Sequence, residues 1–204
     1  GLTRDYEGNS ILNQPDIGIY ESVASRPVKY YVDPSSLSAI ADGSFASPWK
    51  TIGQVNTGTL ALEPGDSVFF KKGQVFNGRL IVQGSGTSTA PIVYTSYGVG
   101  NIPILTNTTK TEELIFIGSK QYIHIDGLKL MDQTMNETDH SIIAKINYGI
   151  TLQNAPNCVI RNCEITKVGI GIAAKDGSNN SLIEQNNIFN LRAIVNSIGG
   201  SDDY

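Results

Sequence analysis

The sequence feature that most constrains the fold is a repeat with a period of 23 residues. The segments CVIRNCEI (158–165) and SLIEQNNI (181–188) align residue by residue at that spacing. IHIDGLKL (123–130) aligns with both and begins 35 residues before the second copy, which is one period plus a 12-residue insertion. A period in the low twenties, with length variation confined to loops, is typical of a solenoid whose repeats pack only on their neighbours.

Each copy predicts two short strands that meet at a bend. Apolar or small residues alternate with polar ones, and a turn residue (Gly127, Asn162 or Gln185) interrupts the alternation. Gly and Asn tolerate left-handed backbone angles well, whereas Gln tolerates them poorly. A further short strand precedes each pair: IFI (115–117), ITL (150–152) and IAA (172–174). Three strands per turn predict an all-β fold, a three-sheet parallel β-helix.

The alignment also predicts which side chains face the interior. The central expectation is that Ile125, Ile160 and Ile183 stack above one another. The other predicted inward stacks are Ile123, Cys158 and Ser181; Leu128, Cys163 and Asn186; and Leu130, Ile165 and Ile188. The two cysteines are therefore expected to be buried thiols, and Asn186 to satisfy backbone groups at the bend. The outward stacks, Asp126, Arg161 and Glu184, and Lys129, Glu164 and Asn187, predict ion pairs between coils.

Weaker copies extend the pattern upstream. They are SVFF (67–70), RLIV (79–82), PIVY (91–94) and IPIL (102–105). Val68 and Ile92 are 24 residues apart, and Ile92 and Ile115 are 23 apart, so we align these three positions. Before them, the sequence predicts a turn and a short helix near 51–60, with Trp49 and Ile52 covering the open apolar end of the solenoid.

The chain is expected to divide into three parts. Residues 1–29 are predicted to be the tail of a preceding module or a linker, because 5–22 looks like the closing segment of another β-helix domain. Residues 30–65 form the cap, and 66–204 form β-helix coils that are incomplete at the C-terminus, because SDDY (201–204) follows a coil with no capping element.

Charge and hydropathy exclude two classes of partner. The formal net charge is −4 and the pI is near 5.1, so the chain has no global basic field for nucleic acid, and an anionic polymer would need a locally positive groove. No apolar run approaches the roughly 20 residues of a membrane span.

A family resemblance follows from four runs: YYVDPSS (30–36), SPWKTI (47–52), LEPGDSVFFKKGQVFNGRL (62–80) and APIVYTSYGVGNIPIL (90–105). They resemble the N-terminal half of pectate-lyase-like right-handed β-helix proteins. The resemblance covers roughly 30–204. It implies a right-handed parallel β-helix with a short N-terminal capping helix, secreted or cell-surface, with a polysaccharide partner and further domains in the same polypeptide.

The resemblance specifies the reaction less well than the fold. It implies a part of a polysaccharide lyase, which works by β-elimination, or of a glycosidase-like protein, and this segment alone is not required to be active. The alternative is a non-catalytic glycan-binding or structural stalk module. In the resembled lyases, substrate lies along the sheet that carries ITL and along its flanking loops. The outward residues there, Phe116, Thr151 and Ala173, include no base, acid or metal ligand, which counts against catalysis in these coils.

The insertion near 131–148 is the predicted binding rim, because long loops on a rigid scaffold often carry function. It supplies Asp132, Glu137, Asp139, His140 and Lys145. His140 and Lys145 are the candidate catalytic base and cationic clamp, although a solvated surface loop explains them equally well.

Other residues complete the candidate site. The candidate substrate contacts are Phe116, Asp139, Lys167, Lys175 and Arg192. Asp202 and Asp203 are candidate calcium ligands, although two adjacent carboxylates are weak evidence for a site that needs about six oxygens. No other cofactor is predicted.

Overall fold

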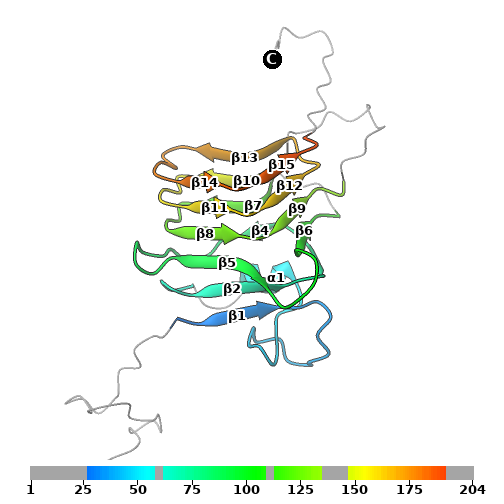
Figure 1. Ribbon diagram of the computed structural model, residues 1–204. Helices are drawn as coiled ribbons and strands as arrows, with labels where there is room; N and C mark the ends of the chain where they lie inside the picture. The colour runs from blue at the N-terminus through cyan, green and yellow to red at the C-terminus, as the bar shows by residue number, and fades with distance from the viewer. Residues whose placement is uncertain (1–26, 58–61, 109–112, 135–146, 192–204) are drawn as a thin grey trace, which may run out of the picture.

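The strands form three parallel sheets that wind into a right-handed β-helix (Figure 1). The computed structural model describes residues 27–57, 62–108, 113–134 and 147–191. Within them, each coil passes from the six-stranded sheet to the five-stranded sheet and then to the four-stranded sheet, and every strand pairing is parallel. Helix is confined there to the short segment α1 (Ile52–Thr57). Within the described residues, no helix is both long enough and apolar enough to span a membrane.

The strands of each sheet stack in spatial order from the lower end of Figure 1 upward. The six-stranded sheet consists of β1 (Lys29–Val32), β2 (Ser67–Lys71), β5 (Ile92–Tyr97), β8 (Ile123–Asp126), β11 (Val159–Arg161) and β14 (Leu182–Glu184). The five-stranded sheet consists of β3 (Val75–Asn77), β6 (Ile104–Thr106), β9 (Lys129–Met131), β12 (Glu164–Thr166) and β15 (Asn187–Phe189). The four-stranded sheet consists of β4 (Leu80–Ile81), β7 (Glu113–Gly118), β10 (Tyr148–Gln153) and β13 (Ile170–Lys175).

The predicted central stack is confirmed. Ile160 pairs with Ile125 on one side and with Ile183 on the other, all in parallel register. Ile125 and Ile160 are fully buried. Because each strand completes its backbone hydrogen bonds with the neighbouring coils, the apolar stack and the hydrogen-bond ladder form together.

The bend between the six-stranded and five-stranded sheets uses the left-handed backbone region in each of the three aligned coils. Gly127, Asn162 and Gln185 have φ of 68°, 54° and 54°. Asn186 stabilises the last of these bends, because its Oδ1 accepts the Cys163 N–H (3.0 Å) and its Nδ2 donates to the Ile160 carbonyl (2.9 Å). The predicted role of this asparagine is confirmed, and its bonds help hold Gln185 in a conformation that glutamine adopts poorly.

The predicted ion pairs between coils are also present. Arg161 Nη2 lies 2.9 Å from Asp126 Oδ2, and Lys129 pairs with Glu164. Both pairs are partly solvent-exposed, so each contributes about 1 kcal/mol or less to stability.

The predicted alignment of the upstream copies was wrong, both in strand register and in the sheet to which one strand belongs. Val68 pairs with Tyr94 and not with Ile92, while Ile92 pairs with Ile123 in the six-stranded sheet. Ile115 lies in the four-stranded sheet, where it pairs with Leu80. All three sheets have the same alternation of inward and outward residues, so spacing alone does not reveal to which sheet a strand belongs.

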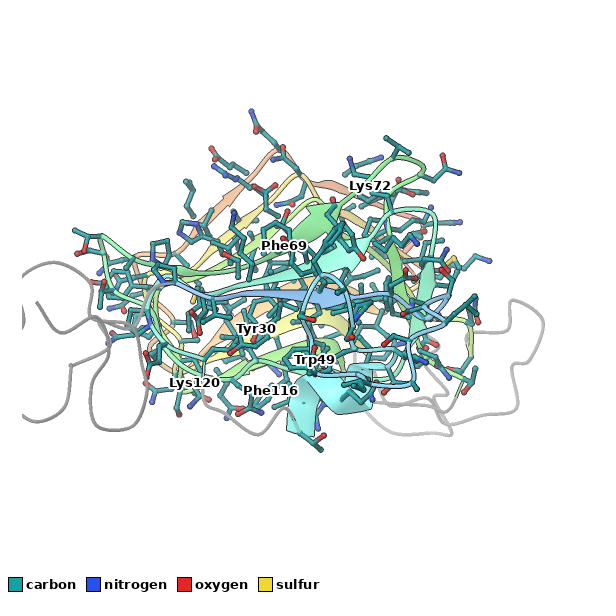
Figure 2. All side chains as sticks on the ribbon, turned by 90° about the horizontal axis from the view of Figure 1, so that it is seen from below. Tyr30, Trp49, Phe69, Lys72, Phe116 and Lys120 are labelled. Atoms are coloured by element: carbon teal, nitrogen blue, oxygen red, sulfur yellow. The ribbon has the colours of Figure 1, made fainter. Side chains whose placement is uncertain are left out.

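The lower end of the barrel is capped as predicted by Trp49 and Ile52. The ring of Trp49 stacks on that of Tyr30 with centroids 4.9 Å apart and planes 6° apart, and both lie near the centre of the end view in Figure 2. Ile52 is almost fully buried. Gly43 has a φ of 87°, and a Cβ there would lie 2.7 Å from the Trp49 ring, so glycine is required where the loop crosses the indole.

Local sequence explains the start of α1. Thr51 Oγ1 accepts the Gln54 N–H at 3.2 Å, and Gln54 Oε1 accepts the Thr51 N–H at 3.2 Å. This reciprocal capping box satisfies two backbone donors at the helix start. The helix was expected over 51–60; α1 ends at Thr57, and 58–61 lie outside the described residues.

The upper coil leaves inward-facing apolar side chains uncovered. Ile183 is 46% exposed and Ile188 is 38% exposed, although the residues below them in their stacks, Ile160 and Ile165, are fully buried. The apolar core therefore extends into the last described coil, and no described residue covers its upper end.

Candidate functional site

The outer face of the four-stranded sheet carries the row that the sequence placed outward. Phe116, Thr151 and Ala173 pair in register across β7, β10 and β13, and Ile81 of β4 extends the row below Phe116. These residues alternate with an inward stack of the buried Ile115 and Ile150 and the partly buried Ile172.

An arginine lies over the lower part of this face. Arg79, directly before β4, has Cζ 5.0 Å from the centroid of the Phe116 ring. Its Nη2 pairs with the carboxylate of Glu113, which is nearly fully buried at the start of β7. Its Nε is buried and has no hydrogen-bond partner. The guanidinium is therefore fixed between a carboxylate and an aromatic ring, a geometry that favours cation–π attraction.

A lysine lies over the upper part of the same face. Lys175 Nζ is 4.1 Å from the centroid of the Tyr148 ring. Tyr148 begins β10 and Lys175 ends the neighbouring β13, so the lysine side chain reaches back along the outer surface. Lys175 makes no ion pair within the described part of the chain. Thr151 belongs to the same strand as Tyr148, is only 3% exposed, and has an Oγ1 without a hydrogen-bond partner.

Sequence reasoning missed Tyr148 because the strand does not alternate strictly. A Cβ at Gly149 would lie 2.6 Å from Cγ2 of Ile165, which is an interior residue, so Gly149 faces inward just as Ile150 does. Two consecutive inward positions shift the phase, and Tyr148 faces outward. The glycine was the available signal, because a glycine within a strand often marks a local bend or a close approach.

The other predicted site residues are not assembled with these. Lys167 is half-buried in the turn between β12 and β13, and its backbone N–H donates to the Asn190 carbonyl at 3.2 Å. No contact joins it to Lys175 among the described residues. The remaining candidates lie outside the described residues: Asp139, His140, Lys145, Arg192, Asp202, Asp203 and also Glu137.

Asp132 is not part of a binding rim, which corrects the sequence-based expectation. It is fully buried, and its Oδ1 accepts the Thr134 N–H at 2.7 Å and the Thr134 hydroxyl at 2.6 Å. Its Oδ2 accepts from Asn147 Nδ2, while Asn147 Oδ1 accepts the Gly169 N–H at 2.8 Å. These bonds tie the end of β9 to the start of β10, so Asp132 supports the fold.

The cysteines are buried thiols, as predicted. Cys158 and Cys163 are free and almost inaccessible, and burial raises the pKa of both thiols, that of Cys163 to about 11. Their sulfur atoms contact backbone carbonyls, such as that of Arg161, 3.3 Å from Cys163 Sγ. Over the described ranges, no group of three or more His, Cys, Asp or Glu side chains is arranged to hold a metal ion.

Three parallel sheets wound into one right-handed coil define the class of pectate-lyase-like parallel β-helix proteins. Within that class, the chain belongs to the family described as periplasmic copper-binding protein (NosD), whose model matches residues 83–202. The described residues do not fit copper, because the protonated buried thiols and the ion-paired carboxylates offer no ligand cluster.

Solved structures show the same fold at low sequence identity. A GH136 lacto-N-biosidase from Eubacterium ramulus has a TM-score of 0.62 and 19% identity over 79% of this chain and 34% of its own. An alginate lyase from Paenibacillus sp. str. FPU-7 has a TM-score of 0.52 and 22% identity over 67% and 42%. A rhamnogalacturonan lyase has a TM-score of 0.52 and 16% identity over 72% and 37%.

The chain thus spans about a third to two fifths of the length of the solved proteins it resembles. No curated protein matches it.

Proposed function

We propose that the outer face of the four-stranded sheet binds a polysaccharide. The observation that carries the proposal is the pair of cation–aromatic contacts, Arg79 with Phe116 and Lys175 with Tyr148. A sugar ring has an apolar C–H face that packs on aromatic rings, and polar edges that hydrogen-bond to fixed charged groups. Solved proteins of the same fold include enzymes named for alginate, rhamnogalacturonan and lacto-N-biose, which supports this class of ligand.

The charges of this face favour a sugar that carries a carboxylate. Glu113 neutralises Arg79, whereas Lys175 is exposed and makes no ion pair among the described residues. A uronate would add the missing anion next to Lys175. The whole chain has a net charge of −4, so this attraction is local and is expected to weaken as salt is raised.

Binding of alginate and polygalacturonate to the full chain, measured by calorimetry, tests the proposal. Lys175→Ala and Phe116→Ala should each weaken binding about tenfold, equivalent to about 1.4 kcal/mol. Lys72→Ala is the charge-matched control, because Lys72 lies on the opposite side of the barrel from Phe116 in Figure 2. Equal affinities for wild type and Lys175→Ala would exclude this face as the site.

A second candidate function is catalysis by a polysaccharide lyase or glycosidase-like protein of which this chain is a part. The supporting observation is that Asn147 is buried and anchored immediately before Tyr148, so the insertion that carries His140 and Lys145 joins the sheet at the proposed binding face. In this proposal His140 removes the proton on the carbon next to the uronate carboxylate, and Lys145 neutralises that carboxylate. The glycosidic oxygen on the adjacent carbon leaves with a proton as the C=C bond forms, while Asp139, Lys167 and Arg192 contact the sugar.

New ultraviolet absorbance from unsaturated sugar ends measures this activity directly. Lys145→Ala should abolish turnover while leaving binding in the calorimeter, whereas a glycan-binding or stalk module would show binding with no turnover in any variant. We propose Asp202 and Asp203 as ligands of an optional calcium ion. Added chelator should then lower thermal stability or activity in the wild type, but not in Asp202→Ala.

The location proposed for this protein is the cell surface or the extracellular medium, and the polypeptide is proposed to contain further coils. The exposed ends of the apolar stacks at Ile183 and Ile188 support an added coil. A longer form of the polypeptide should bind less of a hydrophobic dye than this chain if that coil covers them, and equal dye binding would contradict the idea.

A further inference from the structure

A cluster of aromatic side chains lies on a different surface, the outside of the six-stranded sheet in its first coils. Tyr31 of β1 and Phe69 of β2 pair in register and stack with centroids 5.3 Å apart and planes 19° apart. Tyr97, at the end of β5, packs edge-on against Tyr31 at 5.1 Å. Phe45, from the loop that follows β1, contacts Tyr31 at 5.0 Å and Tyr97 at 6.2 Å. We call these four residues the aromatic platform.

Phe45 is held in place and yet is open to solvent. Its side chain meets two rings of the platform in edge contacts, but the residue is 70% exposed. An aromatic residue that served only to pack the loop would gain stability by burying most of its surface, which Phe45 does not do. A fixed, exposed ring is suited to receive a flat apolar surface from a ligand.

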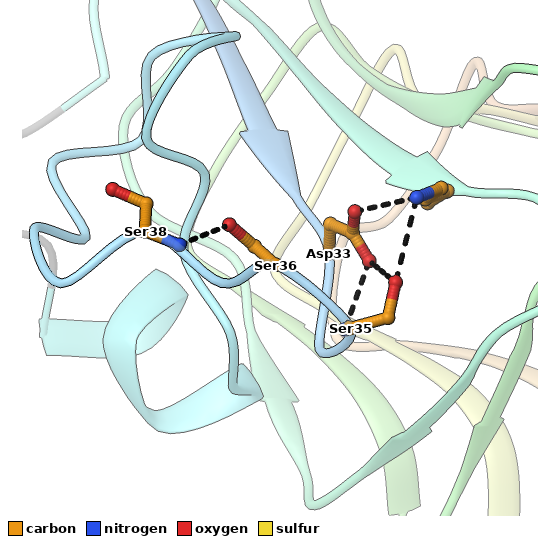
Figure 3. Close-up of polar contacts among 5 residues, drawn as sticks. Asp33, Ser35, Ser36 and Ser38 are labelled. Atoms are coloured by element: carbon orange, nitrogen blue, oxygen red, sulfur yellow. Dashed lines mark hydrogen bonds and ion pairs between the residues drawn. The ribbon is translucent and has the colours of Figure 1, made fainter.

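Polar groups border the platform at the end of β2 and just after β1. Lys71, which pairs in register with Tyr97, has Nζ 2.6 Å from Asp33 Oδ2. Asp33 Oδ1 accepts the Ser35 hydroxyl at 2.6 Å and the Ser35 N–H at 2.9 Å (Figure 3). Aromatic rings and a fixed hydrogen-bonding network therefore lie side by side on the outer surface.

Tyr97 can donate a hydrogen bond over the whole physiological pH range. Burial, and secondarily the charge of Asp33, raises the pKa of Tyr97 to about 12. Its hydroxyl therefore stays protonated.

We propose that the aromatic platform is a second glycan-binding site, which takes neutral pyranose rings on Phe45 and hydrogen-bonds their hydroxyls through Tyr97 and Lys71. The site is separate from the four-stranded sheet: in the end view of Figure 2, Phe69 and Phe116 lie on opposite sides of Tyr30. It extends the proposed function, because the chain would then hold two glycan segments, or two strands of one glycan, on opposite sides of the barrel.

The charges beside the platform favour a neutral sugar over a uronate. Lys71 and Asp33 form an ion pair in which each cancels the other, so the network offers donors and acceptors without a net charge for a uronate. Sugar hydroxyls bind to both hydrogen-bond donors and acceptors. A protein partner would need a larger exposed apolar area than one phenylalanine supplies.

The test measures binding of the full chain to a neutral β-glucan and a neutral galactan by affinity electrophoresis, with polygalacturonate as the anionic comparison. Phe45→Ala should weaken binding to a neutral polysaccharide about tenfold, and Tyr97→Phe by a smaller factor. Val99→Ala is the matched control, because Val99 is an apolar residue that is 95% exposed in the turn after β5 and is not part of the platform. Binding to the neutral polysaccharide should be insensitive to salt.

The outcomes separate this site from the proposed function. Loss of neutral-glycan binding in Phe45→Ala, with polygalacturonate binding unchanged, supports the platform even if Lys175→Ala has no effect. Three binding results overturn it: no binding of either neutral polysaccharide, equal binding by wild type and Phe45→Ala, or an equal loss in Val99→Ala. Concentration-dependent sedimentation of the wild type that Phe45→Ala abolishes would instead identify a second copy of the chain as the occupant, and would also overturn it.

Discussion

Asn147 donates a side-chain hydrogen bond to the buried carboxylate of Asp132, and the two residues bracket the insertion that interrupts the 23-residue repeat. The repeat therefore absorbs additional sequence without loss of register, because the strands on both sides of the insertion are tied together at its base. Asp132 also satisfies two donors of Thr134, which makes it the centre of a small buried network.

Removing this carboxylate should destabilise the fold. Asp132→Ala leaves the buried amide of Asn147 and the donors of Thr134 without their acceptor, so we expect the free energy of unfolding to fall by about 2–3 kcal/mol. Urea unfolding followed by circular dichroism measures the change. Glu63→Ala, which removes an exposed carboxylate that makes no ion pair with another described residue, is the control and should change stability by under about 0.5 kcal/mol. Equal losses in the two variants would contradict the structural role of Asp132.

Stability should depend on position within a single stack. Ile160→Ala removes a fully buried side chain between two coils and should cost about 2–5 kcal/mol. Ile183→Ala makes the same chemical change at the exposed end of the same stack and should cost about 1 kcal/mol. Thermal denaturation of the two variants under one condition compares them. A larger effect at Ile183 would show that this side chain is buried in solution.

The buried, unpartnered hydroxyl of Thr151 predicts a gain in stability when it is removed. Its Oγ1 has no hydrogen-bond partner, so Thr151→Val should raise the free energy of unfolding by about 1 kcal/mol. Thr166→Val changes the equivalent unpartnered hydroxyl on the five-stranded sheet and is the control for stability. Thr151 is only 3% exposed, so neither variant should lower affinity for polysaccharide in calorimetry. A loss of affinity in Thr151→Val alone would show that the ligand reaches this hydroxyl.

The raised pKa of Cys163 predicts a loss of stability at alkaline pH. Burial raises this pKa from 9.0 to about 11, so the folded chain holds the thiol proton more tightly than the unfolded chain. The resulting stability is complete below pH 9 and is lost as the pH rises to about 11, by about 2–3 kcal/mol. Urea unfolding at intervals across this range should give a flatter pH profile for Cys163→Ala than for wild type. Parallel profiles would show that Cys163 does not titrate differently in the two states.

Much of the architecture could be predicted from sequence because its determinants are local. Alternation with a period of two places Ile125 and Ile160 inward, a left-handed bend favours Gly127 and Asn162, and the repeat length brings equivalent positions into register. Even Gln185 follows its aligned partners, because the ladder and the Asn186 amide outweigh the poor intrinsic preference of glutamine.

The sequence by itself determined the number of strands per coil, the inward stacks and the capping role of Trp49, because these depend on short-range patterns. Only the tertiary structure decided that Val68 pairs with Tyr94, that Tyr148 faces outward, and that Arg79 lies over Phe116. The physical reason is that a repeat length does not fix which position of the coil each residue occupies. The sequence gives the period of the repeat. An irregular turn, or a single glycine that faces inward, changes the sheet or the face on which the following residues lie, and this change is seen only in the stacked coils.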